Sequence, residues 1–404
     1  MLRLPPALRP LWPLAKVAYT AVTRTVAPFT TLISRTVGTD GVPLRAVLTA
    51  EEAVAPGNGG GRLFAGRSPE TARRTLPEGI PAGHPVFKGR EIARIPRSAV
   101  LELPAARALG VTGAVVTRTG ALVVEVSPYF GTSRPTEHPV FLHPFLAKPE
   151  PFDGRLAVLA TRGDSIYYHF LLDVLPRLDT LDRCQELSRP DAYYVPAQLP
   201  FQRQLLAELG VGTAAIFDSS LHPHVRASTL VVPGLPDVNM ETPSWVIGFL
   251  RERLLPRMPQ GPRRRLYVTR GTRRNTRRVI NEDQVLDMLA IRGFERIDAG
   301  SLPIRAQIEA FAQAEIIVAP HGSALANLVF ASPGTLIVEL FAPDYVNVCY
   351  WVLAQHVSGL RYRYLVGGDR RVRPERMRGV SSDITVDVDR LAQLLDGGRG
   401  GPRS

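Results

Sequence analysis

The residues best suited to chemistry in this 404-residue chain follow one short apolar run at 316–318. Three β-branched residues there predict a buried parallel strand, which turns at once through His321, Gly322 and Ser323 into a predicted helix over 324–330. A helix N-terminus offers free N–H groups and partial positive charge, which suit a phosphate, and a histidine can add a hydrogen bond. The alternative is that Gly322 only permits a tight turn and that His321 caps the helix.

Two polar residues then stand in apolar surroundings. Asn327 lies inside the predicted helix, where a buried amide needs a partner, so it either faces a ligand or ties two loops together. Glu339 lies near the end of a second predicted buried strand at 336–340, where an unpaired carboxylate is costly. A sugar or ribose hydroxyl, or a nearby arginine, would satisfy it.

A second candidate for anion binding follows the predicted strand at 266–269. Arg270 directly follows the predicted strand. An arginine-rich segment then continues with Arg273, Arg274, Arg277 and Arg278 before Asn281. Guanidinium groups match phosphate oxygens, and neighbouring strand ends share one rim of a sheet, so a diphosphate between Arg270 and His321 is sterically reasonable. For Arg273, Arg274 and Arg277 taken singly a solvated basic loop is favoured, and Asn281 is predicted to cap the next helix.

The segment at 165–181 predicts an amphipathic helix with a possible proton acceptor. His169 and Asp173 are four residues apart and share a face, which Arg177 continues. A histidine oriented by a carboxylate can accept a proton, but the same spacing also describes an ordinary surface ion pair. Pro176 should kink or end this helix.

Alternating periodicities indicate an α/β protein. The C-terminal half has predicted strands at 266–269, 294–297, 316–318 and 336–340, with helices at 282–292 and 303–314. This order predicts a doubly wound βαβαβ half-sheet. In the N-terminal half we predict short strands over 86–126, including a hairpin around Thr119-Gly120, and a strand at 155–160.

Composition shifts predict four segments. They are a basic arm that continues into a Gly/Pro-rich loop or linker over 50–84, together 1–84, then an α/β domain at 85–256, a second domain at 257–390 and a frayed end at 391–404. The boundary is placed at the proline-rich joint at 256–262. Residues 1–39 contain no acid and could form a basic amphipathic helix on an anionic membrane or remain a loosely packed arm.

The composition describes a globular protein with anionic partners. The formal charge is +12, carried almost entirely by arginine, while 45% of residues are hydrophobic and no apolar run reaches the ~18 residues of a membrane span. Cys184 and Cys349 match no metal spacing and are predicted as core residues in a reducing compartment. Asp387-Val388-Asp389 resembles a DxD metal motif, but Asp389 is better explained as a helix N-cap, so no metal ligand is predicted.

Taken together, three motifs resemble glycosyltransferase family 61, which includes bacterial capsular-polysaccharide biosynthesis proteins. They are YYHFLLDVLPRL, TRGTRRNTRRVINE and APHGSALANLVFASPGTLIVEL, and Ser323 stands where the family pattern has alanine. The resemblance covers about residues 85–390. It implies two Rossmann-like domains facing across a cleft, the glycosyltransferase-B architecture, and inverting transfer of a sugar from a nucleotide donor.

Position by position, the resemblance places a set of residues around the donor: Arg270, Asn281, His321, Gly322, Ser323, Asn327 and Glu339. His169, Asp173 and Arg177 would lie across the cleft. We expect a glycan or lipid-linked acceptor and a cytoplasmic protein with a peripheral contact on the inner face of the plasma membrane. No cofactor would be strictly required, although a divalent cation stays possible.

Two other classes of function compete with a transferase. A non-catalytic nucleotide- or polyanion-binding protein of similar fold would explain the charge, but no nucleic-acid module or aromatic interleaving is evident, so no nucleic acid is expected as a partner. A hydrolase using Pro320-His321-Gly322 in an oxyanion hole would need a serine elbow, which the sequence lacks.

Overall fold

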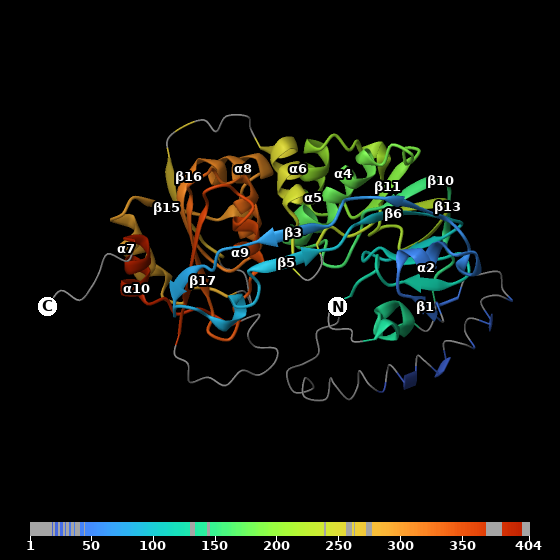
Figure 1. The fold of residues 1–404 in the computed structure, drawn as a ribbon, viewed down its shortest axis with the longest axis horizontal. Helices are drawn as coiled ribbons and strands as arrows, with labels where there is room; N and C mark the ends of the chain where they lie inside the picture. Colours follow the sequence, from blue (N-terminus) through green and yellow to red (C-terminus); the bar gives the residue numbers. More distant parts are fainter. Residues whose placement is uncertain are drawn as a thin grey trace.

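The computed structural model of the protein contains two large sheets (Figure 1). It describes residues 41–43, 45–129, 134–143, 146–237, 240–255, 261, 263–271, 277–368 and 382–397, with single helical residues between 18 and 36. No helix in these ranges is long and apolar enough to span a bilayer. Apart from Gly261, the predicted joint at 256–262 lies outside the described residues, and the predicted domain boundaries stay predictions.

The N-terminal sheet mixes parallel and antiparallel strands. Its described strands are β1 (Arg45–Val47), β2 (Arg62–Ala65), β6 (Ala99–Pro104), β7 (Arg107–Leu109), β8 (Ala114–Val116), β9 (Ala121–Val123), β10 (Glu150–Val158), β11 (Ala192–Val195), β12 (Ile216–Asp218) and β13 (His224–Pro233). Parallel strands run in the order β13-β10-β11-β12, while β6 and β7 pair antiparallel with β13. The predicted hairpin is confirmed, because β8 and β9 pair antiparallel through Val116 and Leu122.

The C-terminal sheet is parallel throughout its described strands. It has the order β15-β14-β16-β17-β18-β4. The strands are β14 (Arg264–Val268), β15 (Phe294–Ile297), β16 (Ala314–Pro320), β17 (Leu336–Phe341), β18 (Arg361–Val366) and β4 (Glu78–Ile80). Every residue of β17 is buried, as expected for a strand covered on both faces.

Helices cover both sheets, and a small sheet lies between them. The described α-helices are α2 (Ala50–Val54), α3 (Tyr167–His169), α4 (Pro176–Arg183), α5 (Pro200–Glu208), α6 (Ser244–Leu254), α7 (Glu282–Ala290), α8 (Ile304–Gln313), α9 (Cys349–Ala354) and α10 (Val388–Leu395). Figure 1 shows the two-stranded sheet of β3 (Glu70–Arg73) and β5 (Ile92–Ile95) between the two large sheets.

Some local expectations are met and others are corrected. The apolar face of α8, with Ile304, Ile308 and Phe311, is buried, and both cysteines are buried thiols. The predicted helix at 324–330 is a 3-10 helix, η9 (Ser323–Phe330). The N-cap of α10 is Asp387, whose side chain accepts from the Arg390 N–H, so the assignment to Asp389 is wrong by two residues.

One hydrophobic core joins the two sheets. It includes Leu171 and Leu250 from the N-terminal half and Leu328, Val329 and Trp351 from the C-terminal half, all with no exposed surface. Because protein interiors are close-packed, a core shared in this way fixes the spacing between the two halves.

The expectation of a linker over 50–84 is wrong. This segment contains α2, β2 and β3, and β4 completes the edge of the C-terminal sheet by pairing with β18. Tyr364 holds β4 in place, because its hydroxyl donates to Pro81 O at 2.6 Å and accepts from His84 N at 3.0 Å. Glycine signalled a loop, but Gly79 is required because a Cβ there would lie 2.3 Å from the Tyr364 ring.

Replacing Gly79 by alanine should therefore destabilise the protein by about 1–3 kcal/mol, the range for overpacking a filled site. Gly212→Ala is the matched control, since a Cβ there meets nothing within 4 Å. Denaturant unfolding of both variants measures the difference. Equal midpoints for the two would show that β4 does not contribute to global stability.

Candidate active site

The C-terminal sheet has one point where its strand order reverses. The chain leaves β14 through α7 to β15 on one side, then crosses through α8 to β16 on the other side of β14. In open α/β sheets the crevice at such a reversal, outside the carboxyl ends of the strands, is where ligands bind. Arg270 follows β14 and His321 follows β16, so two of the predicted residues stand at this reversal.

A cavity of about 320 Å³ opens at this crevice and is walled by both halves of the molecule. We call it the inter-sheet pocket. The C-terminal half contributes Thr269, Arg270, Asp298, Gly300, Gln307, Ser323 and Ala324, and the N-terminal half contributes Ser165, Ile166, Tyr167 and Phe201. The pocket therefore combines a guanidinium, several hydroxyl and amide groups and two aromatic rings.

Arg270 is held against the turn that follows β16. Its Nη1 donates to the carbonyl oxygen of His321 at 2.8 Å, and Arg277 Nε donates to the same oxygen at 2.9 Å. A Cβ on Gly322 would lie 1.7 Å from Arg270 Nη1. Gly322 has an extended backbone, with φ 177°, so glycine is needed there for space and not for conformation.

The His321 side chain points into the interior instead of the pocket. Its Nδ1 lies 2.5 Å from a carboxylate oxygen of Glu339, and its ring packs on Phe341 and Tyr350 at centroid distances of 5.4 and 5.1 Å. Glu339 is wholly buried, and the hydroxyl of Tyr362 donates to its other oxygen. The partners of Glu339 are thus protein groups, which corrects the expectation that Glu339 contacts the ligand and places His321 behind the pocket wall.

Asn327 ties the two halves together, which is the second of its two predicted roles. Its side-chain oxygen accepts from the Tyr167 hydroxyl at 2.7 Å, and its amide nitrogen donates to Gln307 Oε1 at 3.1 Å. Tyr167 and Gln307 both line the inter-sheet pocket. Asn327 is fully buried, so it positions two pocket residues and does not contact the pocket itself.

Two further candidates have structural roles. Arg177 is fully buried and donates to the carbonyl oxygens of Leu159, Ala160 and Pro233, so it does not reach a ligand. Burial lowers the pKa of Arg177 to about 9. Asn281 occupies the N-cap position of α7, but its side chain bonds to the backbone of Val386 instead of capping the helix.

His169 and Asp173 form the predicted pair. His169 Nδ1 lies 2.7 Å from Asp173 Oδ2, and the two side chains keep 20% and 14% of their surface exposed. Between α3 and α4 the backbone forms a short π-helix, η6 (Phe170–Val174), which ends two residues before Pro176. Proline has no N–H to continue an α-helical ladder, and short π-helical segments are frequent at functional sites.

Comparison with known proteins decides the family. Residues 167–338 match the family model described as Glycosyltransferase 61. This stretch of the chain is similar to glycosyltransferase family 61. No curated protein sequence matches the chain.

The matched region of the glycosyltransferase domain is narrower than the predicted 85–390. It begins at Tyr167, the first residue of α3, and ends at Val338, within β17. It therefore spans both the His169–Asp173 pair and the crevice between β14 and β16. The match supports a glycosyltransferase.

Several pocket residues of the glycosyltransferase were missed by the sequence interpretation. Thr269 is the last residue of a predicted strand and Asp298 directly follows another, and these positions alone could have marked them. Tyr167 and Phe201 carried no such signal, because they reach the pocket from the other half of the molecule. Arg273 and Arg274 lie outside the described residues, and Arg278 pairs with Asp383 at 3.0 Å.

The described residues contain no cluster of three or more His, Cys, Asp or Glu side chains suited to a metal ion. His222 is paired with Glu150 at 2.6 Å, and His224 begins β13.

Proposed function

We propose that the protein is an inverting glycosyltransferase that moves a sugar from a nucleotide donor to a glycan or lipid-linked acceptor, with the donor in the inter-sheet pocket. The observation that carries this proposal is the position of that pocket, at the strand reversal of a parallel sheet within a glycosyltransferase 61 domain. An arrangement of the two halves as in glycosyltransferase-B enzymes fits two sheets whose ends share the pocket. A role in making capsular or other surface polysaccharide is part of the same proposal.

The leaving diphosphate needs positive charge and hydrogen-bond donors. Arg270 lines the pocket, and η9 begins beside it at Ser323, so a guanidinium and the N–H groups of a helix start face the same space. These groups would stabilise the charge that develops on the diphosphate as it leaves. We infer no strict need for a metal ion, although a divalent cation could accompany the donor.

Transfer with inversion requires one base. The acceptor oxygen attacks the anomeric carbon, the bond from that carbon to the diphosphate breaks with its electrons on the phosphate oxygen, and the hydroxyl proton passes to the base. A carboxylate only accepts hydrogen bonds, so Asp173 holds the proton of His169 on Nδ1. Nε2 of His169 then carries the lone pair that receives the acceptor proton.

The competing proposal is a nucleotide- or polyanion-binding protein without catalysis. It is motivated by the charge of +12 and by the arginine block. A titration with UDP and GDP in competition with RNA separates the two, because a transferase binds one nucleotide saturably and is not displaced by RNA.

Donor binding should depend on Arg270. Arg270→Ala is expected to weaken nucleotide diphosphate binding by roughly 1.5–3 kcal/mol, the range for hydrogen bonds to charged groups. Gly322→Ala should have a similar effect by displacing the guanidinium, and adding it to Arg270→Ala should cost little more. Calorimetric titration with UDP and GDP measures the affinities of the two single variants and of the double variant.

Arg278→Ala is the matched control for this prediction, since it removes the same charge from an arginine that pairs with Asp383. Wild-type affinity in the Arg270 variant would place the donor elsewhere.

Turnover should depend on His169 and Asp173. His169→Ala or Asp173→Asn is expected to lower kcat by roughly 100-fold or more, because general base catalysis is lost, with nucleotide affinity unchanged. His222→Ala is the control, because His222 forms a similar pair with Glu150 away from the pocket. Sugar transfer and nucleotide binding are measured on the same preparations. Near-normal turnover in both variants would show that His169 and Asp173 form only a helix-surface ion pair and that neither acts in catalysis.

We also propose that the protein is cytoplasmic and contacts the inner face of the plasma membrane through residues 1–39. Apolar side chains of Val22, Phe29, Leu32 and Ile33 are more than half exposed, and the segment carries basic but no acidic residues. A chain beginning at residue 41 should fold, because β1 starts at Arg45, but should no longer float with anionic liposomes. Equal flotation of the full and shortened chains would exclude this segment as the membrane contact.

A further inference from the structure

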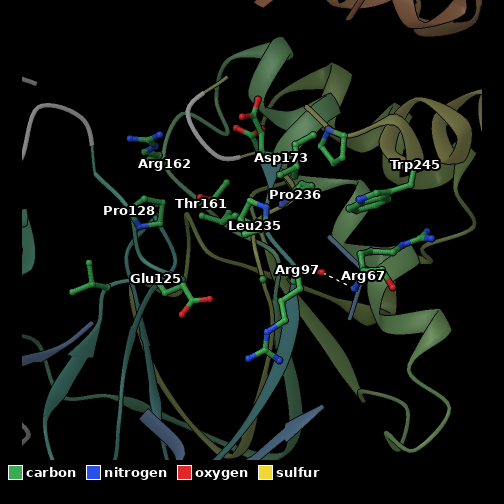
Figure 2. Close-up of a pocket in the computed structure, with 18 residues that line it drawn as sticks. Arg67, Arg97, Glu125, Pro128, Thr161, Arg162, Asp173, Leu235, Pro236 and Trp245 are labelled. Atoms are coloured by element: carbon green, nitrogen blue, oxygen red, sulfur yellow. Dashed lines mark hydrogen bonds between the residues drawn. The ribbon is translucent and has the colours of Figure 1, made fainter. Parts of the chain in front are cut away.

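A second and larger cavity, of about 490 Å³, lies on the N-terminal half of the molecule (Figure 2). In this view Arg162 and Trp245 lie on opposite sides of the cavity, with Asp173 between them. We call it the Trp245 pocket. It is distinct from the inter-sheet pocket, and the two have no lining residue in common.

The Trp245 pocket lies where the strand order of the N-terminal sheet reverses. β10 is followed on one side by β11 and β12, while β13 lies on its other side, so the parallel part of the N-terminal sheet also reverses its order, between β10 and β13. The carboxyl ends of these two strands lead into Thr161-Arg162 and into 234–237, and both segments line the Trp245 pocket. Each large sheet thus has a cavity at its own strand reversal.

One short segment walls both cavities. Thr161 and Arg162 line the Trp245 pocket, Ser165 to Tyr167 line the inter-sheet pocket, and Asp173 returns to the Trp245 pocket. The His169–Asp173 pair therefore stands on the segment between the proposed donor site and this second cavity.

The cavity contains two carboxyl groups whose hydrogen bonding is incomplete. Asp173 uses Oδ2 for His169, and Asp237 uses Oδ2 for the hydroxyls of Thr242 at 3.1 Å and Tyr168 at 3.5 Å. The Oδ1 atoms of both residues are buried, and no described residue donates to either. Buried carboxyl oxygens without partners are costly, so turning either carboxyl group toward a hydroxyl-bearing ligand in the cavity would stabilise it.

The charges around the cavity do not favour an anionic ligand. Of the three arginines that line it, Arg67 pairs with Asp179 and Arg97 pairs with Glu51. Arg162 shares the cavity with three acidic residues, Glu125, Asp173 and Asp237. Trp245 also lines the cavity. The guanidinium carbon of Arg67 lies over one face of its ring, 4.4 Å from the ring centroid. Aromatic rings pack well on the apolar face of a sugar.

We propose that the Trp245 pocket binds an uncharged sugar residue, with the ring stacked on Trp245 and its hydroxyl groups held by Asp173 and Asp237. Assigning this sugar to the acceptor rests on the proposed glycosyltransferase function. The binding itself does not, because it depends only on the groups that line the cavity.

The protonation of Asp237 gives the site a pH dependence. Burial, reinforced by the charge of Asp173, raises the pKa of Asp237 to about 7. Below that pH the Asp237 carboxyl can donate to a sugar oxygen while Asp173 accepts; above it both groups only accept and repel each other. The titratable and charged groups that act on Asp237 are Asp173, His169, Tyr168, Arg162 and Cys349. Binding should therefore weaken as the pH rises through 7.

The test uses the full-length protein and the methyl glycosides of glucose, galactose, mannose and xylose, followed by saturation-transfer NMR, with methyl glucuronide as the charged comparison. At least one uncharged glycoside should bind saturably at pH 6 and more weakly at pH 8.5. Trp245→Ala and Asp237→Ala should weaken that binding by about tenfold or more, whereas Asp237→Asn should keep it and remove its pH dependence.

Two controls keep the outcome decisive. Asp164→Asn changes another buried aspartate, whose pKa burial raises to about 8, but Asp164 does not line the cavity, so glycoside binding should be unchanged. Ser68→Trp places a large side chain in the cavity from an exposed position at its rim. It tests the same site if Trp245→Ala or Asp237→Ala fails to fold. Binding that survives Trp245→Ala or Ser68→Trp, absence of binding by all four glycosides, or preference for the glucuronide would overturn the proposal.

UDP and GDP binding, measured on the same samples, separates the two proposals. Glycoside binding without nucleotide binding would contradict the proposed transferase and leave the sugar site standing. Nucleotide binding without glycoside binding would contradict the sugar site and leave the proposed transferase standing.

Discussion

The buried carboxylate of Glu339 constrains the geometry around it. A carboxylate without solvent contact must be matched by hydrogen-bond donors, and His321 and Tyr362 supply them. This pairing fixes the turn after β16, so the carbonyl oxygen of His321 points to where Arg270 and Arg277 can donate to it. Gly322 leaves the space for Arg270. A polar residue that never contacts the ligand thus decides where the guanidinium stands.

The two cavities are linked by the way in which the halves of the molecule are joined. Each lies at the strand reversal of its own sheet, and the segment from Thr161 to Asp173 walls both. The shared core and the bond between Tyr167 and Asn327 hold this segment at a fixed distance from the C-terminal sheet. A reaction between two bound sugars needs such fixed spacing, since misplacement by about 1 Å can cost two orders of magnitude in rate.

The sequence predicted local structure well where the apolar pattern was continuous. The strands at 294–297 and 336–340, the helix at 303–314 and the hairpin around Thr119-Gly120 all appear within one or two residues of their predicted bounds. It failed over 50–84, because Gly79 meets a packing requirement at Tyr364 within a strand, whereas Gly59-Gly60-Gly61 form only a short turn before β2. It also assigned ligand contacts to Arg177, Asn281 and Glu339, whose partners are protein groups distant in the chain.

The sequence by itself determined the order of strands and helices from β14 to β17 and the arrival of Arg270 and His321 at strand ends, because these follow from periodicities over a few residues. It also determined the His169–Asp173 pair, since four residues bring two side chains onto one face of a helix. Only the tertiary structure decided that Glu339 pairs with His321, that Tyr167 and Phe201 complete the inter-sheet pocket, and that Asp237 lines the same cavity as Asp173. Such contacts join residues between 18 and 160 positions apart, and the sequence contains no local signal for pairings at that range.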